Sequence, residues 1–233
     1  NKIINALKGR NAVIVAPSPK GWSTCARLIE FIHAQLDRIG APRDLVQLLP
    51  SPVSKQSTAE LMRLCDLVVA TGSQANVRAA YASGTPAFGV GAGNVAGIVD
   101  ETADVSLAAD RIVRSKTFDN ATSCSSENSL VIVDAVRAAM LAALEARGAV
   151  LLNPTQKATL QSVMWPEGKL SAAVTGKSAR VIAETAAALD ARDRDAWLAI
   201  ARGNPRILMV TEDGVGHDHP FSGEKLSPVL AIY

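Results

Sequence analysis

Short, continuously apolar segments alternate with amphipathic helical patterns along residues 1–90 of this chain. Unbroken runs of Val, Ile, Leu and Ala are typical of strands in a parallel sheet whose two faces are both covered by helices. The expected strands are residues 11–16, 45–49, 67–70 and 87–90, and the expected helices are residues 22–38, 57–63 and 71–81. Residues 1–90 are therefore predicted to form a doubly wound, dinucleotide-binding α/β domain.

The pattern changes after this point, and a second α/β domain is expected over residues 91–233. Its expected strands are residues 130–133 and 206–210, and its expected helices are residues 103–115, 134–147, 155–165 and 179–189. Asp134 is the expected N-cap of one helix, and Gly148 follows its end. Residues 1–8 resemble the middle of a helix and residues 229–233 resemble a strand. We therefore expect the N-terminal part of the first domain and the C-terminal part of the second to lie outside this chain.

Composition argues against several classes of protein. The formal net charge is +2 and no basic stripe is visible, which gives no reason to expect nucleic acid, and 4% aromatic residues make a base-stacking surface improbable. No apolar run reaches the length of about 18 residues that a bilayer requires, so no membrane contact is expected. Three cysteines without a CxxC spacing argue against a zinc site or a disulfide framework and favour a reducing, cytoplasmic setting.

One cysteine lies in an unusual context for a thiol. Cys124 is surrounded by Ser, Thr, Ala and Asn side chains, which leave room for a substrate and can donate hydrogen bonds to a thiolate. Cys25 and Cys65 have apolar neighbours and are interpreted as packing residues. Cys124 is therefore the candidate nucleophile.

Two glycine-containing segments are candidates for contact with a phosphate group. Residues 89–94, Gly-Val-Gly-Ala-Gly-Asn, resemble a dinucleotide fingerprint, but the third glycine comes too early and the acidic residues Asp100 and Glu101 follow too closely. We interpret this segment as a tight interdomain turn. Residues 71–73, Thr-Gly-Ser, lie between a strand and a helix, where free N–H groups and the helix dipole favour an anion. An ordinary helix cap is the alternative for this second segment.

Polar residues near the C-terminus are weaker candidates. His217 and His219 lie on an expected loop without a third ligand nearby, so no metal site is predicted. Glu224 reads as a solvated loop carboxylate when it is considered alone.

Several of these segments occur together in one known family. In order they are residues 71–73, 84–94, 100–104, 115–120 with Cys124, and 224–228. Their combination resembles the aldehyde dehydrogenase superfamily, specifically its CoA-acylating branch, and residues 120–128 are similar to acylating sulfoacetaldehyde dehydrogenases. The resemblance implies that a Cys124 thiolate attacks an aldehyde and that hydride passes to NAD(P)+, leaving a thioacyl-enzyme.

One position separates the branches of that superfamily. Hydrolytic members carry a glutamate that activates water, and the corresponding residue here is Gly89. Without that base, the resemblance implies that the thiol of coenzyme A takes the acyl group.

The resemblance also implies cofactor contacts and partners. Ala16 stands where the superfamily usually has a lysine, which leaves the choice between NAD and NADP open. The superfamily's oxyanion-hole asparagine is expected upstream of Asn1, with the Cys124 backbone N–H as the second donor. A homodimer or homotetramer is expected. The positions that correspond to the family's nucleotide contacts are Pro17, Ser18, Gly72, Ser73, Val90, Gly91 and Glu224.

The sequence is best explained as a cytoplasmic acylating aldehyde dehydrogenase that acts on a short aldehyde, with sulfoacetaldehyde favoured and acetaldehyde next. A sulfonate requires cationic or N–H donors, and Lys116 and Arg114 lie near Cys124 in sequence. Two alternatives stay open: a hydrolytic aldehyde dehydrogenase, with Glu127 or an absent residue as the base, and a nucleotide- or CoA-binding module without turnover.

Overall fold

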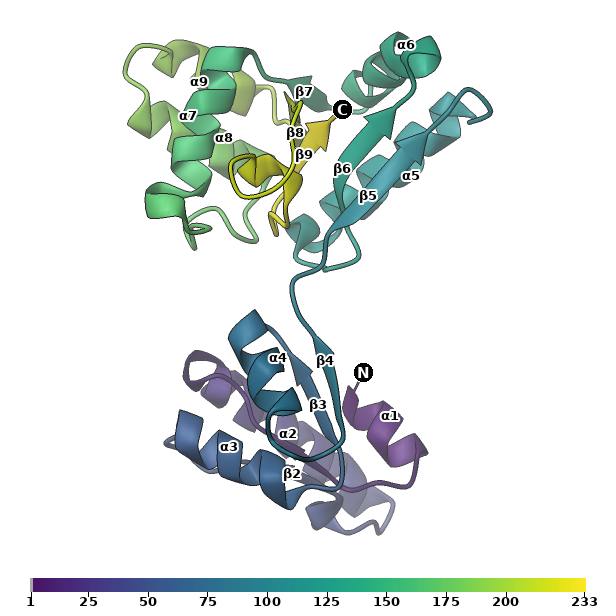
Figure 1. The fold of residues 1–233 in the computed structure, drawn as a ribbon, viewed down its shortest axis with the longest axis vertical. Coiled ribbons are helices and arrows are strands. Elements are labelled where there is room, and N and C mark those ends of the chain that lie inside the picture. The colour runs from purple at the N-terminus through teal and green to yellow at the C-terminus, as the bar shows by residue number, and fades with distance from the viewer. Residues whose placement is uncertain (1) are drawn as a thin grey trace. The chain divides into compact units, whose positions relative to one another are not determined.

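The computed structural model describes residues 2–233 and divides into two compact units, with the boundary after Gly91 (Figure 1). This boundary lies one residue beyond the expected one. The roles assigned to the two parts stay predictions.

The first unit contains two pairs of parallel strands. Strand β1 (Val13–Val15) pairs with β2 (Val46–Leu48), and β3 (Val68–Thr71) pairs with β4 (Ala87–Val90). The helices of this unit are α1 (Lys2–Lys8), α2 (Trp22–Arg38), α3 (Lys55–Leu64) and α4 (Gln74–Tyr81). Ile29, Leu36 and Val46 form one small core, and Val68, Ala70 and Ala80 form another. The parallel α/β arrangement expected from the sequence is therefore present.

The strands of this unit differ from the expectation in one respect. Both of their faces were expected to be covered, yet Val69 is 52% exposed and Phe88 is 66% exposed. The two residues are partners in the β3–β4 register, so they lie on the same face of the pair. Helix α4 packs against the opposite face, because Gly89, the residue after Phe88, lies against Val77 and Tyr81 of α4. The sequence pattern does not reveal this difference in exposure between the two faces, because apolar residues occupy both faces of these strands.

The second unit is built on a five-stranded parallel sheet with the order β5-β6-β9-β8-β7. Its strands are β5 (Val95–Val99), β6 (Glu127–Ile132), β7 (Ala149–Leu151), β8 (Ile207–Thr211) and β9 (Val229–Ile232). Its helices are α5 (Val105–Thr117), α6 (Asp134–Glu145), α7 (Pro154–Met164), α8 (Ala179–Leu189) and α9 (Arg194–Arg202).

Alternating residues of this sheet contribute to two different cores. On β8, Ile207 and Met209 pack with α5 and α6, whereas Leu208 and Val210 pack with α7, α8 and α9. Trp197 of α9 is fully buried in the second of these cores. A central strand buried on both faces explains why residues 206–210 form an unbroken apolar run.

Several expected boundaries were wrong. Strand β5, directly after the segment interpreted as a turn, was not anticipated, and neither were β7 and α9. Strand β6 begins at Glu127 rather than at residue 130. Asp134 is the first residue of α6, Val133 occupies the N-cap position without a side-chain hydrogen bond, and the helix ends at Glu145. Short or polar edges of elements give little periodicity, which accounts for these errors.

Within residues 2–233, none of the helices combines the length and the apolar character needed to cross a bilayer.

Candidate active site

Cys124 lies in the loop that joins α5 to β6. Helix α5 is followed by a short 3-10 turn, Phe118–Ala121, in which Asp119, Asn120 and Ala121 all have positive φ angles of 48°, 50° and 58°. Such angles are unfavourable for residues other than glycine, although Asp and Asn tolerate them better. The side chain of Asn120 donates to the carbonyl of Gly176 at 3.0 Å and helps to hold this conformation.

The thiol at the end of this loop is accessible. Cys124 is exposed, whereas Cys25 and Cys65 are half-buried. Polar neighbours support the turn, since the hydroxyls of Ser123 and Ser125 lie 2.8 Å apart. The exposure of Cys124 is what an attacking nucleophile requires.

Gly93 packs directly against Cys124. A Cβ atom placed on residue 93 would lie 2.6 Å from the Cys124 carbonyl oxygen and 3.2 Å from its Cβ. Real Cβ atoms do not approach a backbone oxygen so closely, so a glycine is required at this position. Gly93, the last glycine of the segment, therefore allows close packing on the cysteine loop.

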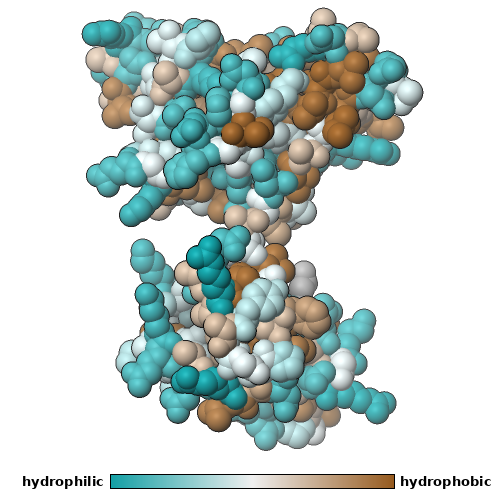
Figure 2. All heavy atoms as spheres, in the orientation of Figure 1, coloured by the Kyte–Doolittle hydropathy of each residue, from teal (hydrophilic) through white to brown (hydrophobic). Residues whose placement is uncertain are grey.

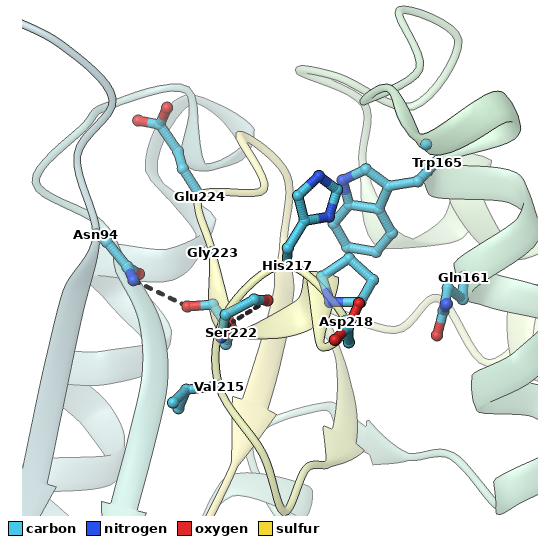
Figure 3. Close-up of a pocket in the computed structure, with 12 residues that line it drawn as sticks. Asn94, Gln161, Trp165, Val215, His217, Asp218, Ser222, Gly223 and Glu224 are labelled. Carbon is cyan, nitrogen blue, oxygen red and sulfur yellow. Dashed lines mark hydrogen bonds between the residues drawn. The ribbon is translucent and has the colours of Figure 1, made fainter. Parts of the chain in front are cut away.

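Glu224 is joined to the same glycine. The Gly93 N–H donates to Oε1 of Glu224 at 3.2 Å, and the Asn94 side chain donates to the Ser222 carbonyl at 2.9 Å (Figure 3). The segment 222–224 is thereby held beside the start of β5. The structure thus brings Cys124 and Glu224 together through Gly93, although they are a hundred residues apart in sequence.

A cavity of about 730 Å³ lies beside Glu224 in the second unit. Figure 3 shows that side chains from α7 and from the loop before β9 converge on it, with His217 close to the indole of Trp165. Its lining residues are Asn94, Gln161, Trp165, Gly168, Val215, Gly216, His217, Asp218, Pro220, Ser222, Gly223 and Glu224.

The nucleotide-contact candidates of the first unit follow the carboxyl ends of its strands. Pro17 and Ser18 come after β1, and Gly72 and Ser73 come after β3. Gly72 has φ +130°, a conformation that suits glycine, and Ser73 is the N-cap of α4, with its Oγ accepting from the Asn76 N–H at 3.3 Å. The ordinary cap is therefore present, and it does not exclude contact with a phosphate. Strand ends of this kind are where open α/β sheets bind ligands.

Val90 and Gly91 complete this set of candidates at the end of β4. Val90 is 54% exposed, and its carbonyl accepts from the Gly72 N–H at 3.1 Å. At Gly91 a Cβ would meet the Gln74 side chain at 2.6 Å. The contacts of these residues with a nucleotide stay predictions.

Gly89 has no room for a side chain in the present packing. A Cβ on residue 89 would lie 2.5 Å from Cγ1 of Val77 and 2.9 Å from Cε2 of Tyr81, both on α4. The Gly89 N–H also donates to the Tyr81 hydroxyl at 3.0 Å. The space that a glutamate would need is therefore filled by α4.

The two basic residues near Cys124 in sequence are poorly placed for a substrate. Lys116 is fully buried, and burial lowers its pKa to about 7 despite the opposing effect of the Glu127 carboxylate. Arg114 is exposed and pairs with Asp110 at 3.1 Å. Lys116 therefore cannot meet a substrate in this conformation.

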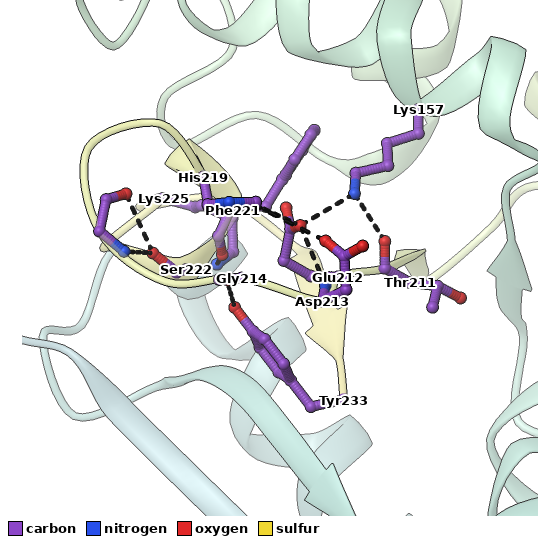
Figure 4. A network of polar contacts seen from close by, with 11 residues as sticks. Lys157, Thr211, Glu212, Asp213, Gly214, His219, Phe221, Ser222, Lys225 and Tyr233 are labelled. Carbon is purple, nitrogen blue, oxygen red and sulfur yellow. Dashed lines mark hydrogen bonds and ion pairs between the residues drawn. The ribbon is translucent and has the colours of Figure 1, made fainter.

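His219 belongs to a network of polar contacts around the buried Glu212 carboxylate (Figure 4). Oε1 of Glu212 lies 3.0 Å from Nδ1 of His219 and 3.1 Å from Nζ of Lys157. Burial raises the pKa of Glu212, but the hydrogen bonds from His219 and Lys157 outweigh it, so this pKa lies below its ordinary value. Asp213 completes a group whose spacing would suit a metal ion, but the Lys157 ammonium already neutralises Glu212.

Several residues of the site were not singled out from the sequence. Asn94, Asn128 and Lys225 have contacts around Glu224, and Gly93 was considered only as part of a turn. Gly93, Asn94 and Lys225 lie in the segments that carried the family resemblance, whereas nothing marked the amide of Asn128 as a ligand for a distant backbone.

Fold and site together define an α/β protein with an exposed cysteine, a glycine packed on it and a glutamate joined to that glycine. The model of the aldehyde dehydrogenase family matches residues 1–190. The chain belongs to the aldehyde dehydrogenase family.

Two named relatives and one solved structure show which members of the family this chain is similar to. The chain is 62% identical to the acylating sulfoacetaldehyde dehydrogenase of Cupriavidus necator, over 100% of this chain and 45% of that protein. It is 42% identical to the acylating sulfoacetaldehyde dehydrogenase of Bilophila wadsworthia, over 100% of this chain and 48% of that protein. An acetylating aldehyde dehydrogenase from Geobacillus thermoglucosidasius superposes with a TM-score of 0.88 at 36% identity, over 100% of this chain and 49% of that one. The chain spans about half the length of the curated relatives it matches.

Proposed function

We propose that this chain carries the nucleophile and cofactor contacts of a CoA-acylating aldehyde dehydrogenase. The overall reaction is aldehyde + CoA + NAD(P)+ giving acyl-CoA + NAD(P)H + H+. Relatives named as acylating enzymes match the chain over its full length, which supports this branch of the family.

The observation that carries the proposal is the packing at Gly89. A hydrolytic enzyme needs a base to activate water, and the corresponding position is blocked by Val77 and Tyr81. A thiol is far more nucleophilic than water once it is ionised and needs less help from a base. Coenzyme A is therefore the acceptor that best matches this site.

The proposed chemistry is centred on Cys124. Its thiolate attacks the aldehyde carbon and forms a C–S bond, and the carbonyl electrons move onto oxygen, where the Cys124 backbone N–H is a hydrogen-bond donor. When the C–H bond breaks, the oxygen electrons restore the carbonyl and a thioester remains on Cys124. A bound nicotinamide supplies the hydride acceptor. The CoA thiolate then attacks the thioester, and the Cys124 thiolate leaves.

The residues present fit a nicotinamide dinucleotide. Gly72 adopts a positive φ at a strand end before the N-terminus of α4, where backbone N–H groups and the helix dipole favour a pyrophosphate. Glu224 uses Oε1 for the Gly93 N–H, and a carboxylate has further acceptor positions for ribose hydroxyls. Pro17, Ser18 and Ser73, at the strand ends of the first unit, are its further candidates for contact with the nucleotide. Either NAD or NADP is compatible with Ala16 at the end of β1.

We propose sulfoacetaldehyde as the first substrate to test and acetaldehyde as the second. The support is that two relatives, at 62% and 42% identity, are named acylating sulfoacetaldehyde dehydrogenases. The buried Lys116 is not part of the sulfonate contact in this proposal.

We extend the proposal to a homodimer or homotetramer that works in the cytoplasm. Ile98 and Val131 are register partners on β5 and β6 and are 77% and 43% exposed, within an apolar region that Figure 2 shows over these strands. Exposed apolar surface of this kind is typical of a contact with another surface. Light scattering on the complete protein measures the oligomeric state.

Spectrophotometry of NAD(P)H formation tests the activity. The complete protein is mixed with sulfoacetaldehyde and NAD+ or NADP+, with and without CoA, beside a Cys124→Ala variant. Reduction that requires both CoA and Cys124 is expected. Steady turnover without CoA would show that water is the acceptor, and turnover by the Cys124→Ala variant would exclude the proposed nucleophile.

A further inference from the structure

Lys225 is a fully buried lysine that immediately follows Glu224. Its Nζ donates to the carbonyl of Phe221 at 2.5 Å (Figure 4) and to the carbonyl of Gly223 at 3.0 Å. These two hydrogen bonds satisfy the buried amine, and burial lowers the pKa of Lys225 well below its ordinary value. The side chain of Lys225 therefore closes the turn that leads into Glu224.

The backbone of the same residue is joined to a different element. The Lys225 N–H donates to Oδ1 of Asn128 at 3.2 Å, and Asn128 is buried on β6, four residues after Cys124. The side chain of an internal strand residue thus reaches the segment that carries Glu224.

These contacts close a ring around the candidate site. Gly93 lies against the Cys124 backbone and donates to Glu224, while the Lys225 N–H donates to Asn128 on the strand that follows Cys124. Glu224 is consequently held by Gly93, which precedes β5, and its neighbour Lys225 is held by Asn128 of β6.

We propose that Lys225 and Asn128 are positioning residues that hold the Glu224 carboxylate at a fixed place relative to Cys124. This inference rests on the proposed role of Glu224 as a ligand of the nicotinamide ribose. Neither residue touches the reacting atoms, so both act through Glu224.

A purely structural role is the alternative to be excluded. Lys225 lies among buried residues. Removal of its amino group leaves two buried carbonyls without a donor, which lowers the free energy of unfolding whatever the role of Lys225. A double-mutant cycle distinguishes the two roles. If Lys225 affects cofactor binding only by positioning Glu224, its substitution has little further effect once Glu224 is replaced.

The experiment measures the dissociation constant of NADH and NADPH by fluorescence in the complete protein. The variants are Lys225→Met, Glu224→Gln and the double variant, with Lys177→Met as the matched control because Lys177 is exposed. Lys225→Met is expected to raise the dissociation constant about tenfold in the wild-type background and less than about twofold in the Glu224→Gln background. If Lys225→Met raised the dissociation constant by the same factor in the wild-type and Glu224→Gln backgrounds, the proposal would be overturned.

A second pair of variants applies if Lys225→Met does not fold. Asn128→Ala removes the acceptor for the Lys225 N–H, whereas Asn128→Asp keeps an oxygen at that place. We expect Asn128→Ala to weaken cofactor binding and Asn128→Asp to restore most of it. Equal weakening by both variants, or no weakening by Asn128→Ala, would contradict the positioning role.

The outcomes also distinguish this inference from the proposed function. If the wild-type protein binds no nicotinamide cofactor, or if Glu224→Gln binds as tightly as wild type, the cofactor role itself fails. If Glu224→Gln weakens binding and Lys225→Met does not, only the positioning role fails.

Discussion

Gly93 lies so close to Cys124 that any side chain on it would collide with the nucleophile's own backbone. The nearest approach, 2.6 Å between a Cβ on residue 93 and the Cys124 carbonyl oxygen, is shorter than real contacts of this kind. The glycine N–H at the same position holds Glu224. One residue without a side chain therefore sets the distance between the two candidate functional groups.

Gly93→Ala is expected to displace the cysteine loop and lower turnover. Overpacking of this kind costs about 1–3 kcal/mol in the free energy of unfolding. We expect urea unfolding to show that loss, and turnover to fall by at least about tenfold, because a small misplacement of reacting atoms is costly. Gly21→Ala is the control for stability, since a Cβ there meets nothing closer than 3.4 Å. Wild-type turnover by Gly93→Ala would contradict the close packing.

Gly89→Glu is expected to damage the fold without creating a hydrolytic enzyme. The new side chain would collide with Val77 and Tyr81 on α4, and we expect a loss of about 1–3 kcal/mol in the free energy of unfolding. Phe88→Glu is the matched control, because the Phe88 side chain is 66% exposed and should tolerate the charge. Turnover is measured with and without CoA. A stable Gly89→Glu protein with CoA-independent turnover would show that the packing does not exclude the base.

Cys124 is expected to react with iodoacetamide before the other two thiols. It is exposed, whereas Cys25 and Cys65 are half-buried, so the three thiols of one molecule form an internal comparison. Peptide mass spectrometry over a time course gives the alkylation rates of the three thiols in the folded protein. Slower labelling of Cys124 than of Cys25 or Cys65 would argue against its role as the nucleophile.

Lys116 should make stability depend on pH between about 7 and 10.5. Burial lowers its pKa to about 7, below the value of 10.5 in the unfolded chain, so the unfolded state binds more protons in that range. The free energy of unfolding should therefore rise with pH there, by up to about 1.4 kcal/mol per pH unit from this residue, and the penalty is fully present below pH 7.

The variant Lys116→Met tests whether the buried lysine makes the free energy of unfolding rise with pH. The variant should show a flatter dependence of the free energy of unfolding on pH than wild type, measured by urea denaturation at several pH values. Lys177→Met provides the comparison for an exposed lysine. Identical slopes for wild type and Lys116→Met would mean that Lys116 titrates normally in the folded state.

The sequence predicted the helices best where their amphipathic pattern was long and clear. Helix α2, Trp22–Arg38, matches the expected range, and α8, Ala179–Leu189, does so as well. Strand β5 was missed because Gly97 and Ala96 weaken an apolar run, and β7 was missed because three residues give no readable period. Tertiary pairing rather than local propensity forms these strands.

The candidate site was predicted in part. Polar neighbours indicated an accessible Cys124, and its exposure agrees with that interpretation. A lysine near a nucleophile in sequence suggests an anion ligand. Lys116 does not fit this expectation, because its position on helix α5 places its side chain in the interior. Contacts such as Asn128 with Lys225 join residues 97 positions apart and leave no local signal.

The place of β9 in the sheet has a consequence for how the second unit is assembled during synthesis. Residues 229–232 come after the other four described strands in the sequence, yet they lie between β6 and β8. Until they leave the ribosome, the β5–β6 and β7–β8 halves have no shared strand to join them. Closure of the sheet must wait for contacts such as Ser129 with Ala231, and pairings between such distant residues form slowly. Before β9 inserts, the edges of β6 and β8 that it joins are therefore unpaired with each other.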